Sequence, residues 1–295
     1  MEEAALKAGM IVFNRLKPEW GPGKIIQVEG QFYHVFWRDR PGLETTLMTA
    51  AGVARASSQD GTEFDGLPKF VRAGNVFAVK GERLSLDAAI GRFRRFFSLD
   101  FDDPVYWKQE RAYKEKAHKH YQDVLGGGKL HGLLMQDLAR LVEETNRVVG
   151  KVNLLFSVEQ AAFRDALKDA QAARAYFERL DALLQAPKVT EDVYAPYAKA
   201  VRDLPADRGR VASWPVATLL PFLAQPDRHM FLKPSVTQVA ALALGVNLNY
   251  RAEPNWLTYS SLLHLAADYK EKLSPLRPRD LIDVQSFFWV VGRYQ

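Results

Sequence analysis

The chain has 295 residues, of which 47% are hydrophobic and 25% are charged, so it holds enough apolar side chains for the core of a globular protein. It contains no cysteine, which excludes disulfides, thiolate metal sites and cysteine nucleophiles. The formal net charge of +5 permits a nucleic-acid partner without requiring one.

The N-terminal segment and the hydropathy of the chain indicate where in the cell the protein is found. The start, MEEAALKAGM, is acidic and has no basic segment followed by an apolar one, so it does not resemble a secretory signal. No apolar run approaches the ~20 residues of a membrane-spanning helix. We therefore expect a soluble, cytoplasmic protein that does not interact with a membrane.

Residues 10–48 are rich in β-forming side chains separated by turn residues. The runs KIIQV and QFYHVFW flank a corner at Glu29 and Gly30, which is a hairpin signal. In residues 32–37 the alternation puts apolar side chains on both faces of the strand. A small sheet buries one face in its own core, so we expect the other to pack on the helical part of the chain or to contact another molecule.

The segment KPEWGPGKIIQVEG contains a Pro-x-Trp-Gly-x-Gly pattern, made by Pro18, Trp20, Gly21 and Gly23. With its flanking strands, the segment resembles the Tudor-like or SH3-like barrel found at the C-terminal end of UvrD and PcrA helicases and in related stand-alone bacterial proteins. The resemblance covers a small part of the chain. It implies a module that docks onto RNA polymerase or nucleic acid.

Three aromatic residues of this region are candidates for the binding surface of the barrel: Trp20, Tyr33 and Trp37. Strand alternation places Tyr33 and Trp37 on the same face. Trp20 also suits a position in the core of the barrel, and that alternative stays open.

Residues 51–75 are rich in Gly, Ser, Asp and Ala and have weak periodicity, which is the composition of a linker or surface loop. The expected fold is therefore α+β. A small N-terminal SH3/Tudor-like β-barrel with its linker occupies residues 1–75, and a mainly α-helical domain follows in residues 76–295.

Two helices are predicted directly after the linker. Ser85 suits the N-cap of the first, and Asp103 with Pro104 suits the start of a long second helix that ends at Gly126. The predicted inward residues of the long helix are Tyr106, Tyr113, Ala117, Tyr121 and Val124, and the outward ones are Lys108, Arg111, Glu115 and Lys119. The outward face is compatible with a phosphate-binding surface, but such charged faces are usually only solvated.

One pair on this helix has the spacing of a metal site. Glu115 and His118 reproduce the Glu-x-x-His pattern of di-iron helical bundles, which use the pattern on two helices. The chain has no second such pair, so we predict neither a metal site nor a cofactor.

Further helices are predicted across residues 131–186, where Ser157 and Gln160 resemble a capping box. Several stretches between residues 90 and 292, including WPVATLLPFLAQPDRHMFLKPSVT and LRPRDLIDVQSFFWV, resemble one family of bacterial proteins of uncharacterised activity. This resemblance implies a single helical domain, and it implies no particular activity.

A compact polar cluster interrupts the apolar C-terminal third. Arg228, His229 and Lys233 lie just before a helix that Pro234 opens. Cations beside a helix N-terminus are able to bind an anion or a backbone phosphate. The alternative is a polar cluster that supports a turn.

Two acids mark the start of the last helix. Asp280 and Asp283 suit its first turn, and Arg279 is placed for an i,i+4 pair with Asp283. Metal-dependent nucleases gather carboxylates around a divalent ion, so Asp280 and Asp283 are an alternative acidic site. An enzyme of this kind would bring both into one cleft with His229 and Lys233.

Several enzyme classes lack their sequence signatures here: the chain has no P-loop, no dinucleotide-binding glycine pattern after a strand, no Gly-x-Ser-x-Gly elbow and no His-Glu-x-x-His. The leading hypothesis is a non-catalytic bacterial adaptor or regulatory factor that binds RNA polymerase or another protein complex, with DNA or RNA as further partners. The first alternative is a nucleic-acid-processing enzyme with its site in the C-terminal helices. The second is a purely structural protein-interaction module.

Overall fold

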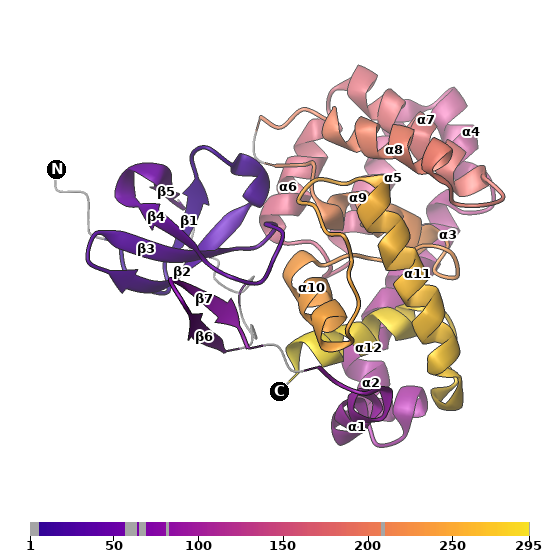
Figure 1. The fold of residues 1–295 in the computed structure, drawn as a ribbon. Helices are drawn as coiled ribbons and strands as arrows, with labels where there is room; N and C mark the ends of the chain where they lie inside the picture. The colour runs from indigo at the N-terminus through magenta and orange to yellow at the C-terminus, as the bar shows by residue number, and fades with distance from the viewer. Residues whose placement is uncertain (1–5, 57–63, 65–68, 81–82, 208–209, 295) are drawn as a thin grey trace.

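The computed structural model describes residues 6–56, 64, 69–80, 83–207 and 210–294. It confirms an α+β protein in which a small antiparallel sheet region at the N-terminal end is followed by a helical region (Figure 1). The acidic start at residues 1–5 lies outside the described residues, as do residues 57–63 and 65–68 of the predicted linker. Within the described chain, no helix combines the length and apolar content needed to cross a membrane.

Five strands form one antiparallel sheet in the order β4-β3-β2-β1-β5. Their bounds are β1 Ile11–Asn14, β2 Pro22–Glu29, β3 Phe32–Trp37, β4 Thr46–Thr49 and β5 Val53–Arg55. The predicted corner at Gly30 joins β2 to β3, and Gly30 adopts a φ of 60° that suits glycine. A register shift between Ile25 and Gln27 bends β2.

A second hairpin, β6 (Phe70–Ala73) with β7 (Val76–Val79), packs against this sheet. The ring of Phe36 on β3 lies 5.1 Å from that of Phe70 and 6.5 Å from that of Phe64, measured between centroids. At His34 and Phe36 the second apolar face of β3 therefore packs on this hairpin, so the expectation that it packs on the helices was wrong there. Phe32, on the same face, remains exposed. The prediction of a linker was also wrong where β5 and β6 lie, and residue 75 falls in the turn of the hairpin.

The helical region begins with α1 and ends with α12. The helix bounds are α1 Leu86–Phe96, α2 Pro104–Tyr106, α3 Ala112–Leu125, α4 Lys129–Gln136, α5 Leu138–Gly150, α6 Ser157–Ala166, α7 Ala170–Gln185, α8 Glu191–Arg202, α9 Trp214–Ala224, α10 Pro234–Ala243, α11 Trp256–Lys272 and α12 Leu281–Arg293. Helix α12 is buried along most of its length and packs beside α10 (Figure 1). Gly292 permits this close approach, because a Cβ there would lie 2.5 Å from the carbonyl oxygen of Val236.

Several helix ends follow from single residues. The side chain of Ser85 accepts a hydrogen bond from Ala88 N–H, and that of Asp103 accepts one from Val105 N–H, so both predicted N-caps are confirmed. The predicted capping box at Ser157 was wrong by one residue. Helix α6 is capped from Phe156, whose N–H donates to Glu159 Oε2 at 3.0 Å.

The long helix predicted from Asp103 contains an irregularity that changes its exposed face. Residues Trp107–Arg111 form a π-helical turn between α2 and α3. A π-turn holds more residues than an α-turn, so it rotates the side chains around it relative to an ideal helix. Arg111, predicted to face outward, is buried, and so is Lys114.

Candidate functional site

The aromatic residues of the N-terminal motif lie largely within the packing of the protein itself. Trp37 is 1% exposed, and its indole N–H donates to Thr46 Oγ1 at 2.6 Å. Trp20 is half-buried, with its ring centroid 6.1 Å from that of Trp37 and the Arg40 guanidinium 5.4 Å from its centroid. Tyr33 is half-buried against the same cluster. Placing Trp37 on a binding surface was therefore wrong, because its indole fills the core of the sheet.

The loop after β3 attaches the sheet to the helical region through buried charges. Arg38 donates to Asp39 through Nε and Nη2, both at 2.8 Å, and its Nη1 lies 3.3 Å from a carboxylate oxygen of Glu159 at the start of α6. Asp39 also pairs with Arg210. Gly21 makes room for this network, because a Cβ there would lie 2.5 Å from Asp39 Oδ2. Part of the motif thus serves the attachment of the two regions.

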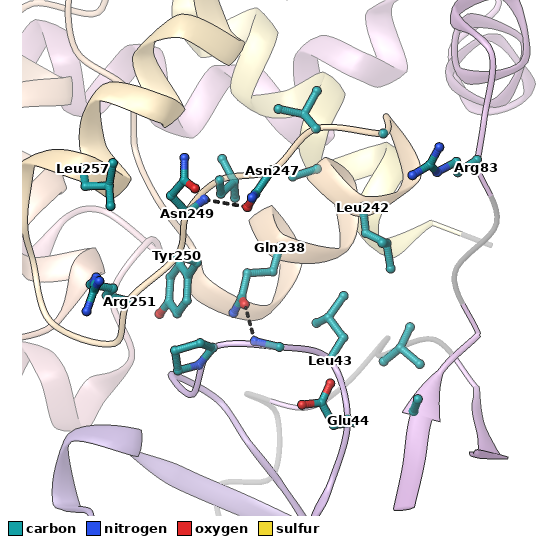
Figure 2. A pocket seen from close by; sticks show the side chains of 18 residues that line it. Leu43, Glu44, Arg83, Gln238, Leu242, Asn247, Asn249, Tyr250, Arg251 and Leu257 are labelled. Atoms are coloured by element: carbon teal, nitrogen blue, oxygen red, sulfur yellow. Dashed lines mark hydrogen bonds between the residues drawn. The ribbon is translucent and has the colours of Figure 1, made fainter. Parts of the chain in front are cut away.

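A cavity of about 840 Å³ lies next to this attachment, between the sheet, α10 and the loop before α11. Figure 2 shows Gln238 at its centre, where the Oε1 atom accepts a hydrogen bond from Gly42 N–H at 3.2 Å. Leu43 and Leu242 project into the space. Because the polar side chain at its centre is used to join the two regions, we assign this cavity to the interface between them.

Two apolar side chains of the sheet remain exposed side by side. Phe32 on β3 is 37% exposed and Leu47 on β4 is 46% exposed. Phe32 pairs with Thr49, and Leu47 pairs with His34, so the two side chains are diagonal neighbours on one face. β4 is the end strand of the five-stranded sheet. The chain just before β4 pairs with β7 through an antiparallel bridge between Glu44 and Ala78. We call Phe32, Leu47 and the side of β4 that faces away from β3 the β4 edge.

The predicted anion site does not form, because its three side chains have separate partners. Arg228 donates to the carbonyl oxygen of Ala186 at 2.5 Å. His229 is fully buried, with Nδ1 2.9 Å from the hydroxyl of Tyr259, and burial lowers its pKa to about 3. Lys233 Nζ donates to the carbonyl oxygen of Leu154 at 3.1 Å. The polar cluster therefore supports the surrounding turn and helix packing.

Asp280 and Asp283 do lie together, but around an arginine. Nη1 of Arg111 lies 2.7 Å from Asp280 Oδ1 and 2.9 Å from Asp283 Oδ1. Tyr106 donates to Asp283 Oδ1 at 2.5 Å, and the predicted pair of Arg279 with Asp283 is present at 2.9 Å. Burial alone would raise the pKa of Asp283, but the hydrogen bond from Arg279 and the charge of Arg111 lower it below its ordinary value.

The ionic cluster of Arg111, Asp280 and Asp283 is buried and charge-balanced, whereas a metal-binding acidic site would be open and negatively charged. Its carboxylates are neutralised by buried arginine, and Asp280 is also the N-cap of α12, accepting from Ile282 N–H at 2.9 Å. His229 and Lys233 contact other parts of the fold, so the described residues do not place the four side chains in one cleft. The geometry therefore does not support the nuclease hypothesis.

A buried lysine that the sequence pattern did not predict lies next to the cluster. Lys114 is 1% exposed and donates to Ser286 Oγ at 2.8 Å, and its Nζ lies 3.6 Å from Glu110 Oε2. Burial lowers its pKa to about 8, and the charge of Glu110 opposes this effect. The spacing of Glu110 and Lys114 at i,i+4 was visible in the sequence, but the π-turn that directs them inward was not.

No group of three or more potential metal ligands occurs among the residues that the structure describes. In the Glu-x-x-His pair, Glu115 accepts a hydrogen bond from Arg111 at 2.7 Å, and Nδ1 of His118 lies 2.7 Å from the carbonyl oxygen of Leu223.

Comparison of the chain with models of protein families, with curated proteins and with solved structures finds no match.

Proposed function

We propose that this protein is a non-catalytic adaptor that uses the β4 edge to bind a partner complex. The observation that carries the proposal is that Phe32 and Leu47 are exposed as neighbours beside an end strand. Phe13 on β1 is also exposed, but β1 is paired on both sides. An end strand with free backbone groups is a template for strand addition by a partner, and neighbouring apolar side chains supply specificity.

The attachment of the sheet supports this role. Arg38, Asp39, Glu159 and Arg210 join the sheet to the helical region through a buried network. Binding at the β4 edge would therefore position the whole helical region relative to the partner, as an adaptor requires.

The proposal includes the finer fold expectation, an SH3/Tudor-like barrel. One support is that β1 pairs with both β2 and β5, so the strands that come first and last in the chain lie side by side. The other is that β2 is bent at its register shift. With the motif at Pro18–Gly23, these features make RNA polymerase the first partner to test and nucleic acid the second.

The test is a pull-down with purified RNA polymerase. We expect Phe32→Ser combined with Leu47→Ser to remove binding, because both side chains are exposed and lie on the β4 edge. Leu16→Ser is the matched control, since Leu16 is 82% exposed and lies after β1. Equal retention of polymerase by wild type and the double variant would contradict the proposal.

A parallel titration separates the two kinds of partner. Binding of DNA or RNA through phosphate contacts weakens steeply with added salt, whereas binding of a strand to an apolar edge depends weakly on salt. If the chain binds nucleic acid with a steep salt dependence that the double variant retains, the β4 edge is not the functional surface.

A further inference from the structure

The cavity at the junction of the two regions has an apolar lining that stays partly exposed. The lining includes Leu43 from the chain before β4, Leu242 from α10 and Leu257 from the start of α11. Leu242 and Leu257 are 41% and 48% exposed. Large apolar side chains that stay exposed around one hollow are typical of a binding surface. We call this space the junction groove and define it by five of its lining residues: Leu43, Arg83, Leu242, Arg251 and Leu257.

An arginine lies at each end of the junction groove, Arg83 at one end and Arg251 at the other (Figure 2). Both are exposed, and neither side chain has a hydrogen-bond or ion-pair partner among the residues that the structure describes. The backbone beside Arg83 is fixed to α10, because Leu84 N–H donates to the carbonyl oxygen of Ala243 at 2.7 Å. The backbone of Arg251 is fixed to α11, because its N–H donates to Thr258 Oγ1 at 3.1 Å. The groove therefore offers two unpaired cations at fixed backbone positions.

The charges around the junction groove favour an acidic ligand. Glu44 is the one carboxylate in the described lining. Its Oε1 atom accepts a hydrogen bond from Nη2 of Arg40 at 3.1 Å, so its charge is balanced within the protein. The two arginines at the ends therefore give the groove an excess of positive charge. A ligand with negative charges is complementary to it, and a basic ligand is repelled.

The order of groups along the junction groove fits an extended peptide. Apolar side chains lie between the two arginines (Figure 2), so a matching ligand has acids at both ends and apolar groups between them. A small acid with one carboxylate and an apolar tail would pair with only one arginine. Asn247 is exposed in the same lining, and its Oδ1 accepts a hydrogen bond from Asn249 N–H at 2.8 Å. Its side-chain N–H groups have no acceptor among the described residues, so they are able to donate to a peptide carbonyl oxygen.

We propose that the junction groove binds an extended segment of a partner protein in which acidic residues flank large aliphatic ones. The acids would pair with the two arginines, and the aliphatic side chains would pack on the three leucines. The cavity volume of about 840 Å³ lies within the range of about 300–1,000 Å³ that is typical of binding pockets. The inference does not rest on the proposed function, because the junction groove shares no residue with the β4 edge. It also leaves the hydrogen bond between Gln238 and Gly42 in place.

Selection of random heptapeptides displayed on phage, with the full chain as the target, tests the proposal without a known partner. We expect the enriched sequences to contain several Leu, Ile or Val residues between Asp or Glu residues. Each enriched peptide is synthesised with a fluorophore, and its affinity is measured by fluorescence polarisation. Replacing its acids by Asn or Gln should weaken binding by about tenfold or more, because the charge-assisted hydrogen bonds to arginine are lost.

Variants of the protein connect this binding to the junction groove. Arg83→Gln combined with Arg251→Gln should weaken the acidic peptide by about tenfold or more and leave its Asn/Gln analogue unchanged. Leu242→Ser should weaken both peptides by about threefold or more, because it removes apolar contact area. The matched controls at exposed positions are Arg95→Gln combined with Arg140→Gln, and Leu99→Ser.

The inference is overturned if the selection enriches no peptide of this pattern, or if the double arginine variant binds the enriched peptides as tightly as the wild type. Titration with decanoate tests a different occupant. If decanoate binds and depends on the arginines where no peptide does, the groove belongs to a small amphipathic acid, and the peptide assignment is wrong.

The β4 edge is tested separately in the same assay. The variant with Phe32→Ser and Leu47→Ser should bind the enriched peptides like the wild type, whatever its effect on polymerase. Loss of peptide binding in that variant would place the peptide at the β4 edge and overturn the inference.

Discussion

Gly23 on β2 lies directly beneath the indole of Trp37 on β3. A Cβ at position 23 would come within 2.6 Å of Trp37 Cζ3 and equally close to Cγ1 of Val35. Both neighbours are core side chains of the sheet, so neither has free space into which it could move. The second glycine of the motif is therefore required for the packing of the tryptophan, which explains the pattern without an external ligand.

Gly23→Ala should destabilise the protein by about 1–3 kcal/mol, the usual cost of overpacking a core. The measurement is the free energy of unfolding in urea. Gly91→Ala is the control, because Gly91 lies within α1 with open space around it and alanine there should stabilise the helix by up to about 1 kcal/mol. A Gly23→Ala protein as stable as wild type would show that the sheet core is loosely packed.

Asp283→Asn should destabilise the protein by about 3–5 kcal/mol, since it leaves the buried guanidinium of Arg111 with less compensating charge. Asp268→Asn is the matched control, because the Asp268–Lys272 pair has both side chains almost half exposed and should contribute about 0–1 kcal/mol. The comparison is made by chemical denaturation at neutral pH. Equal effects of the two substitutions would mean that the cluster around Arg111 contributes no more than a surface ion pair.

Local signals in the sequence predicted much of the fold. The corner at Gly30 and the caps at Ser85 and Asp103 depend on residues next to each other in the chain, and these predictions are confirmed. The glycine-rich and serine-rich composition of residues 51–75 predicted a linker, but β5 forms there because it pairs with β1, about 40 residues earlier in the chain. Pairing with a distant strand leaves no local periodicity to detect.

The candidate sites were harder to predict, because their chemistry depends on distant partners. The 3.6-residue period of an ideal helix predicts that Arg111 faces solvent. The π-turn at Trp107–Arg111 rotates its side chain inward instead. Asp283 was correctly paired with Arg279, its neighbour in sequence, but its contact with Arg111 joins residues 172 positions apart. Similarly, the alternation in β3 predicted two apolar faces, but the hairpin that covers one of them was not recognised.

The buried imidazole of His229 should make stability fall in mild acid. Its folded-state pKa is about 3 against an ordinary value of 6.5, so below pH 6.5 the unfolded chain binds a proton that the native state does not. Unfolding is thereby favoured by up to about 1.4 kcal/mol per pH unit. Urea denaturation from pH 7 to about pH 5 should show this slope in wild type and lose part of it in His229→Gln.

The control for that measurement is His264→Gln, which changes an exposed histidine of α11 and should leave the slope as it is. The prediction fails if the wild type and His229→Gln lose stability in parallel over this pH range. In that case the carboxylates, and not His229, would account for the acid sensitivity.

The buried ammonium of Lys114 should produce a second slope, in mild base. Burial lowers its folded-state pKa from 10.5 to about 8, so between these values the unfolded chain holds a proton that the native state has released. Stability should therefore rise with pH from about 8, by up to about 1.4 kcal/mol per unit. The window ends near pH 10, because buried tyrosines such as Tyr121 have a raised pKa in the native state and favour unfolding above that value.

Lys114→Met should remove this slope, since methionine has a similar length and no titratable group. Lys116→Met, at an exposed position two residues along the same helix, should keep it. Free energies of unfolding measured in urea at intervals between pH 7.5 and about 10 distinguish the two variants. If Lys114→Met shows the same rise in stability as the wild type, then Lys114 keeps its proton throughout this range, and the ion pair with Glu110 outweighs the effect of burial.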